Sequence, residues 1–118
     1  MVISGLAFLE TRGRLEVRIL VDLTVMNASA IRNTVLSAWE DRGRPPVLVL
    51  DLAGARHIDS SGVGALMEIA HRIEGAGVRL VLSGLNPTAQ RMLDRTGLAM
   101  LFTIHDPAKP GARDLVYG

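Results

Sequence analysis

The sequence predicts an α/β domain with a mixed sheet that contains parallel strands. Short apolar segments of strand length alternate with amphipathic segments of helix length, in the order ββαβαβαβ. This alternation is typical of parallel strands joined by crossover helices. Of the 118 residues, 48% are hydrophobic and 21% are charged, which is the composition of a folded chain. We expect one domain over residues 1–118.

The first two strands are predicted to form a hairpin. Residues 6–10 are rich in apolar side chains, and residues 11–14 have the composition of a turn. In the next segment, Leu15, Val17 and Ile19 alternate with charged side chains and therefore share one face. This pattern indicates a hairpin with one buried and one solvated face.

A first helix is predicted from Asn27, a favourable N-cap residue, to about Trp39. Glycine and prolines in residues 43–46 end it. The apolar stripe of this helix consists of Ala28, Ile31, Val35, Ala38 and Trp39. On a second predicted helix, Glu68 and Arg72 stand four residues apart and are expected to form a solvated ion pair.

The remaining elements follow from apolar runs and chain breakers. Residues 47–50 and 78–82 lack polar alternation, so we predict strands buried on both faces. The second helix is expected over residues 61–73, and a third helix is expected to begin at Asn86. A last strand is expected over residues 100–104.

The composition excludes several classes of function. The chain has no cysteine, which excludes thiol catalysis and cysteine-ligated metal sites. Its net charge of +1 gives no electrostatic footprint for nucleic acid or a membrane surface. No segment approaches the ~20 apolar residues of a membrane span, and residues 1–6 lack the basic start of a signal peptide. We therefore expect a soluble, cytoplasmic protein that binds no nucleic acid directly.

The segment 56–64 joins a predicted buried strand to the second helix. In open α/β folds, ligands and chemistry collect at such loops. Asp59 or Ser60 is expected to cap the helix, and the helix dipole favours a phosphate on Ser60 by ~0.3–1 kcal/mol. Gly62 and Gly64 carry no side chain and keep the approach open. From the residues alone, a capped helix start without further role is the better-supported interpretation.

Between residues 47 and 104 the sequence resembles the STAS domain, most closely that of the bacterial anti-sigma factor antagonists. The strings that carry the resemblance are VLVLDL (47–52), IDSSGVG (58–64), GVRLVL (77–82), NP (86–87) and RMLDRTGL (91–98). They occur in the family's order and spacing. The resemblance implies a mixed sheet of four to five strands with helices packed mainly on one side.

The resemblance also implies a function. In this family the serine after the aspartate is phosphorylated by a partner kinase that is itself an anti-sigma factor, and the unphosphorylated antagonist binds this partner and frees the sigma factor. Matched onto this sequence, the phosphoacceptor is Ser60 and Asp59 is its neighbouring cap. The implied partner-binding surface at the helix start consists of Ser61, Gly62, Val63 and Gly64. The implied partners are a serine kinase of the GHKL type and a phosphatase, with a weak homodimer as an open option and no cofactor.

One segment departs from the family pattern. Many antagonists carry a Gly-Glu-Leu-Asp-like turn before the first helix, whereas residues 21–24 here read Val-Asp-Leu-Thr. The departure concerns kinase docking more than the fold. The alternative is a STAS domain without phosphorylation, which serves as a scaffold or as a subunit of a lipid or anion transport assembly or of a stress-signalling complex.

Motifs for other chemistry are incomplete. The segment 62–64 lacks the third glycine of a dinucleotide fingerprint, because position 67 is a methionine. No Gly-x-Ser-x-Gly elbow surrounds Ser60, so we do not expect an enzyme. The three histidines, His57, His71 and His105, do not have metal-ligand spacing.

Overall fold

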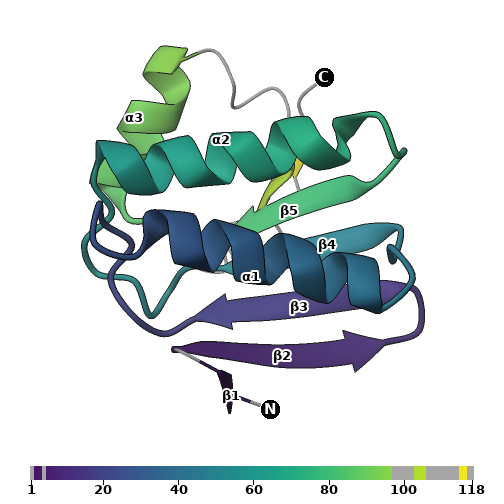
Figure 1. Cartoon of the computed structure of the whole chain (residues 1–118). Coiled ribbons are helices and arrows are strands. Elements are labelled where there is room, and N and C mark those ends of the chain that lie inside the picture. Colours follow the sequence, from purple (N-terminus) through teal and green to yellow (C-terminus); the bar gives the residue numbers. More distant parts are fainter. Residues whose placement is uncertain (1, 4, 97–102, 106–114, 117–118) are drawn as a thin grey trace.

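The computed structural model of the chain describes residues 2–3, 5–96, 103–105 and 115–116 (Figure 1). The elements are, in chain order, β1 (Val2–Ile3), β2 (Leu6–Thr11), β3 (Arg14–Ile19), α1 (Ala28–Asp41), β4 (Val47–Asp51), α2 (Ser60–Glu74), β5 (Arg79–Ser83), α3 (Pro87–Thr96), β6 (Thr103–His105) and β7 (Leu115–Val116). The strands form one sheet in which each strand pairs with its neighbours in the sequence.

This sheet confirms the predicted α/β class. The pairs β3–β4, β4–β5 and β5–β6 are parallel, and the pairs β1–β2, β2–β3 and β6–β7 are antiparallel. Within the described residues the sheet has seven strands, whereas the resemblance implied four to five. The two additional strands, β1 and β7, have two residues each. Such short strands have no periodicity that a sequence could reveal. The first part of the strand expected over residues 100–104 lies outside the described residues.

The predicted hairpin is present in β2 and β3. Arg12 and Gly13 form its turn, and Gly13 adopts a φ of +72°, which glycine tolerates best. Leu15, Val17 and Ile19 are fully buried. The charged residues between them lie on the opposite face of β3, as the alternation predicts.

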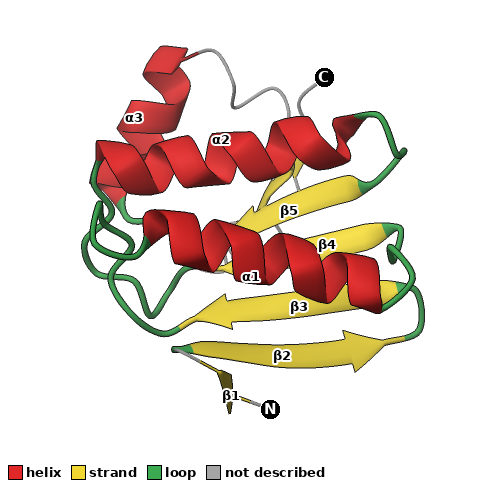
Figure 2. Ribbon diagram, in the orientation of Figure 1, coloured by secondary structure: helices red, strands yellow, loops and turns green. Residues whose placement is uncertain are grey.

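The long helices cover one face of the sheet. Figure 1 and Figure 2 show α1 and α2 side by side in front of β3, β4 and β5, with α3 packed near the start of α2. Fully buried Leu48 and Leu50 of β4 meet Val35 of α1 and Leu66 of α2 in one apolar core. Each such side chain contributes about 1.5–3 kcal/mol when it leaves water. Within the described residues, no helix is long and apolar enough to cross a membrane.

Asn27 has the predicted position before α1 but not the predicted role. Its side chain does not cap the helix. Instead, Oδ1 accepts a hydrogen bond from Thr24 N at 3.0 Å, and Nδ2 donates to the Asp22 carbonyl at 2.7 Å. The side chain of Asn27 therefore stabilises the turn that enters α1, because an asparagine side chain can bond to neighbouring backbone groups in a turn as well as to helical amides.

The predicted ion pair between Glu68 and Arg72 is wrong. Oε2 of Glu68 accepts from Nη1 of Arg32 on α1 at 2.8 Å. The helical spacing alone predicted an intrahelical partner. Packing of α1 beside α2 supplies a guanidinium that the sequence separates from Glu68 by 36 positions.

Candidate functional site

The loop between β4 and α2 is fixed from two sides. Oδ1 of Asp22 accepts from His57 N at 3.1 Å, and Nδ2 of Asn86 donates to the Arg56 carbonyl at 2.9 Å. Leu23 and Ile58 form a parallel bridge, with Leu23 N bonded to the His57 carbonyl at 2.9 Å. This loop lies at the carboxyl ends of the parallel strands, where the sequence predicted a functional site.

Asp59 is the N-cap of α2, which settles the choice that the sequence left between Asp59 and Ser60. Its Oδ1 accepts from Gly62 N at 2.9 Å, and its Oδ2 accepts from Val25 N at 3.0 Å. The amide of Gly62, followed by that of Val25, lowers the pKa of the Asp59 carboxyl below its usual range. The side chain is therefore a carboxylate at neutral pH.

The two serines after Asp59 differ in exposure. Ser60 is the first residue of α2 and is exposed, whereas Ser61 is half-buried. An enzyme that modifies a hydroxyl must reach it, so Ser60 is the more accessible acceptor of the two. An added phosphate on Ser60 would lie at the start of α2, where the helix dipole favours negative charge.

The next three residues divide between the core and the surface. Gly62 and Val63 are buried, and Val63 is part of the core. A Cβ on Gly62 would overlap the Leu23 carbonyl oxygen and lie 2.9 Å from Cγ2 of Ile58, so the close packing of α2 requires a glycine. Gly64 is half-buried, and a Cβ there would meet no atom within 4 Å. Of the predicted partner-binding residues, Ser61 and Gly64 are thus the accessible ones.

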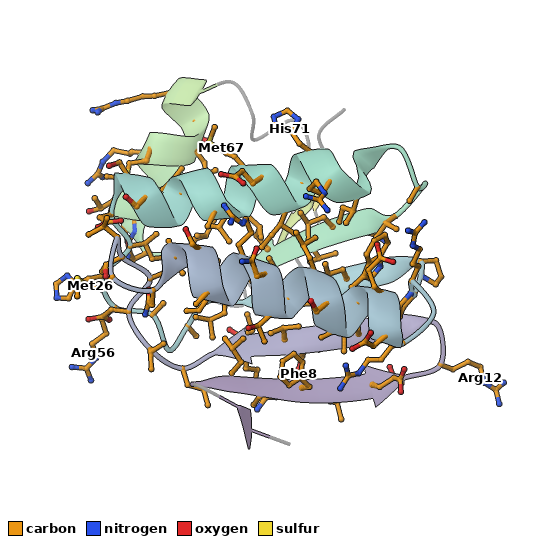
Figure 3. The ribbon with its side chains drawn as sticks, viewed as in Figure 1. Phe8, Arg12, Met26, Arg56, Met67 and His71 are labelled. Carbon is orange, nitrogen blue, oxygen red and sulfur yellow. The ribbon has the colours of Figure 1, made fainter. Side chains whose placement is uncertain are left out.

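A hollow of about 270 Å³ lies between the first halves of α1 and α2. We name it the α1–α2 hollow; its lining residues are Val25, Ala28, Ser29, Arg32, Ser61, Gly64, Ala65 and Glu68. At its edge, Val25 is 71% exposed, and the adjacent Met26 is 89% exposed. Figure 3 shows Met26 and Arg56 projecting from the end of the molecule at which both helices begin.

Sequence reasoning did not assign Val25 to this site. It considered Asp22 only within the segment that departs from the family pattern, and Asn86 only within a family motif and as a helix start. For Val25 the sequence offers one signal, the apolar pair Val25 and Met26 in a segment that has to turn. A second hollow of about 430 Å³ lies on the other side of the loop, lined by Arg56, His57, Ile58, Asp59, Asn86 and Thr88. In the described part of the chain, no group of three or more His, Asp or Glu side chains could hold a metal ion.

Comparison with known protein families identifies the fold. The model of the STAS domain matches residues 7–108. The chain belongs to the STAS domain family. The anti-sigma F factor antagonist of Paenibacillus polymyxa is 30% identical over 95 residues, which cover 80% of each chain. The resemblance that the sequence motifs indicated is thereby confirmed.

Solved structures with this fold include bacterial proteins. An anti-sigma factor antagonist from Mycobacterium paratuberculosis superposes with a TM-score of 0.73 at 21% identity, covering 85% of this chain and 83% of the other. The Bacillus cell fate determinant SpoIIAA in its phosphorylated form superposes with a TM-score of 0.67 at 22% identity, covering 86% and 89%. At these identities the similarity establishes the fold.

Proposed function

We propose that this STAS protein is an anti-sigma factor antagonist whose binding to an anti-sigma factor is switched by phosphorylation of Ser60. The observation that carries the proposal is the exposure of Ser60 at the first turn of α2, beside a capping aspartate that fixes its backbone. The relative from Paenibacillus polymyxa and the phosphorylated form of SpoIIAA support it.

The switch acts through charge. The partner kinase transfers the γ-phosphoryl group of ATP to Oγ of Ser60, a base of the kinase takes the hydroxyl proton, and ADP leaves. The phosphoserine brings about −1.5 to −2 charges next to the Asp59 carboxylate. A partner surface shaped for a neutral hydroxyl then meets concentrated negative charge and binds more weakly. A phosphatase restores the hydroxyl by hydrolysing the phosphate ester.

The departure in residues 21–24 is compatible with this proposal. Asp22 binds the amide of His57, and Val25 donates to Asp59, so the turn is held against the acceptor loop. A partner that contacts Ser60 therefore meets Val25 and Met26 on the same surface. This arrangement supports docking through the turn despite the missing Gly-Glu-Leu-Asp-like sequence.

The first test is peptide mass spectrometry of the protein isolated from its native host during growth and under stress. We expect a phosphate on Ser60 that appears and disappears with conditions. Proteins of the native host that bind this chain are then captured and purified. The kinase is identified as the one that phosphorylates this chain at Ser60 with ATP. If Ser60 carries no phosphate under any condition, the unphosphorylated scaffold or transport subunit becomes the better account.

The second test measures binding of that kinase to three variants. Ser60→Ala should bind like the wild type and block switching, and Ser60→Asp should bind more weakly. Ser37→Asp is the matched control, because Ser37 is exposed on α1, outside the residues that line the α1–α2 hollow. Equal binding by Ser60→Ala and Ser60→Asp would refute the charge-based switch.

A further inference from the structure

Gly64 lies inside α2, yet no described part of this chain requires a glycine at that position. A Cβ would meet no atom within 4 Å, whereas one at Gly62 would collide with the backbone of Leu23. Glycine inside a helix is less stable than alanine because it loses more backbone entropy on folding. The missing side chain at Gly64 therefore costs stability and leaves the α1–α2 hollow open.

The hollow offers hydrogen-bond donors. Nη1 of Arg32 donates to Glu68 at 2.8 Å and Nε donates to Asn33 at 3.2 Å, so the guanidinium is held in place. Its Nη2 has no hydrogen-bond partner among the described residues. Ser29 and Ser61, each of which carries a hydroxyl group, belong to the same lining.

The acidic groups near these donors already have partners. Arg32 is 24% exposed, and its partner Glu68 is 58% exposed. Glu68 is the one acidic residue of the lining and is paired with Arg32, and the first turns of α1 and α2 contain none. The carboxylate of Asp59, at the N-cap of α2, accepts from the amides of Gly62 and Val25. A carboxylate that enters the hollow can share the Arg32 guanidinium, because a guanidinium has donors for two acceptors.

We propose that the α1–α2 hollow receives one acidic side chain, Asp or Glu, of the partner protein. Its carboxylate accepts hydrogen bonds from Arg32 and the serine hydroxyls, and its carbon chain passes over the bare Cα of Gly64. This inference rests on the proposed function, since the partner is the anti-sigma factor. It also connects docking to the switch: a phosphate on Ser60, next to Ser61 of the lining, repels the incoming carboxylate.

The steric part is tested by filling the hollow from Gly64. The Kd of the kinase that phosphorylates Ser60 is measured by calorimetry for Gly64→Ala and Gly64→Leu. The matched controls are Gly75→Ala and Gly75→Leu, because Gly75 ends the same helix in a right-handed helical conformation and also has open space around it. We expect Gly64→Leu to weaken binding about tenfold or more, as for a central interface residue, and Gly75→Leu to bind like the wild type.

The charge part is tested by a reversal. Each acidic residue on the partner is replaced by lysine, and each variant is titrated with the wild type and with Arg32→Glu. We expect one lysine variant of the partner to bind the wild type about tenfold or more weakly than the unchanged partner does. The same lysine variant should regain affinity for Arg32→Glu. Arg72→Glu, at an exposed position on α2, is the control, and it should restore the affinity of no lysine variant.

The outcomes separate the two proposals. If the wild type binds no anti-sigma factor, the proposed function fails and this inference with it. If the wild type binds and Ser60→Asp weakens binding, but Gly64→Leu behaves like Gly75→Leu, only the hollow is wrong. If Gly64→Leu weakens binding and no acidic residue of the partner couples to Arg32, the occupant is not a carboxylate and the inference is overturned.

Discussion

Oδ2 of Asp59 accepts a hydrogen bond from Val25 N at 3.0 Å, which ties the residue before Ser60, the proposed phosphoacceptor, to a turn 34 positions earlier in the chain. The other oxygen of the same carboxylate caps α2 by accepting from Gly62 N at 2.9 Å. One side chain thus joins the entry turn of α1 to the start of α2. The backbone at Ser60 depends on both bonds, because Ser60 lies directly between Asp59 and the capped amide.

Removing the carboxylate should loosen both helix starts. We expect Asp59→Ala to lower the urea midpoint of unfolding and to speed hydrogen exchange at the amides of Val25 and Gly62, because both lose their acceptor. Asp59→Asn keeps one carbonyl oxygen and should fall between Asp59→Ala and the wild type. Asp41→Ala, at the exposed end of α1, removes the same charge and should not lower the midpoint. Unchanged exchange at Val25 in Asp59→Ala would contradict the hydrogen bond.

The pKa of Asp59 predicts a pH dependence of stability. The carboxyl has a pKa of about 3.9 in an unfolded chain. Hydrogen bonds from the amides of Gly62 and Val25 lower this pKa in the folded protein. A depressed folded pKa gives stability that is complete above the unfolded value and is lost as the pH falls through the folded value. We expect the difference in unfolding free energy between the wild type and Asp59→Asn to be constant down to about pH 5 and to shrink below about pH 4.

That difference is measured by urea unfolding of both proteins across the pH range. Using a difference cancels the titration of the other carboxyl groups, which are the same in both chains. A difference that grows as the pH falls would mean that the folded state raises the pKa of Asp59, against the observed donors.

The glycines of α2 should respond in opposite directions to alanine. Gly62→Ala forces a methyl group against the Leu23 carbonyl and Ile58, and we expect a loss of ~1–3 kcal/mol in the free energy of unfolding. Gly64→Ala places its methyl group in open space, and we expect a gain of roughly 0.5–1 kcal/mol. Chemical denaturation of both variants measures the change in the free energy of unfolding. A loss of stability in Gly64→Ala would show that an unseen constraint, and not partner binding, keeps the glycine there.

How far the sequence predicts this site depends on the distance over which each interaction acts. The cap before α2 and the start of α3 at Asn86 are local patterns, and the structure confirms them, with Asn86 Oδ1 accepting from Ala89 N at 2.8 Å. Phosphorylation of Ser60 stays a prediction. Asn27 has the predicted place, but its side chain bonds to the backbone of Thr24 and Asp22. Capping propensity does not predict this, because it takes no account of competing partners in a turn.

The remaining features of the site required the packed fold. Two hydrogen bonds, from Val25 N to Asp59 and from Asn86 to the Arg56 carbonyl, join segments that lie about 30 positions apart in the sequence. The periodicity of a sequence does not show which distant segments pair. Gly62 and Gly64 look equivalent in sequence, yet one is needed by the core and the other faces a hollow. The two-residue strands β1 and β7 exist only through pairing with longer neighbours.

The ion pair between Arg32 and Glu68 should couple the two helices measurably. We expect a double-mutant cycle with Arg32→Gln and Glu68→Gln to give a coupling free energy of about 0.2–1 kcal/mol, because both groups are partly exposed. The coupling should decrease at high salt, since ions screen an exposed pair. The matched cycle with Arg72→Gln and Glu68→Gln tests the intrahelical pair that the spacing suggested, and it should give no coupling. A larger coupling to Arg72 than to Arg32 would mean that Glu68 points along α2 in solution and leaves Arg32 free at the hollow.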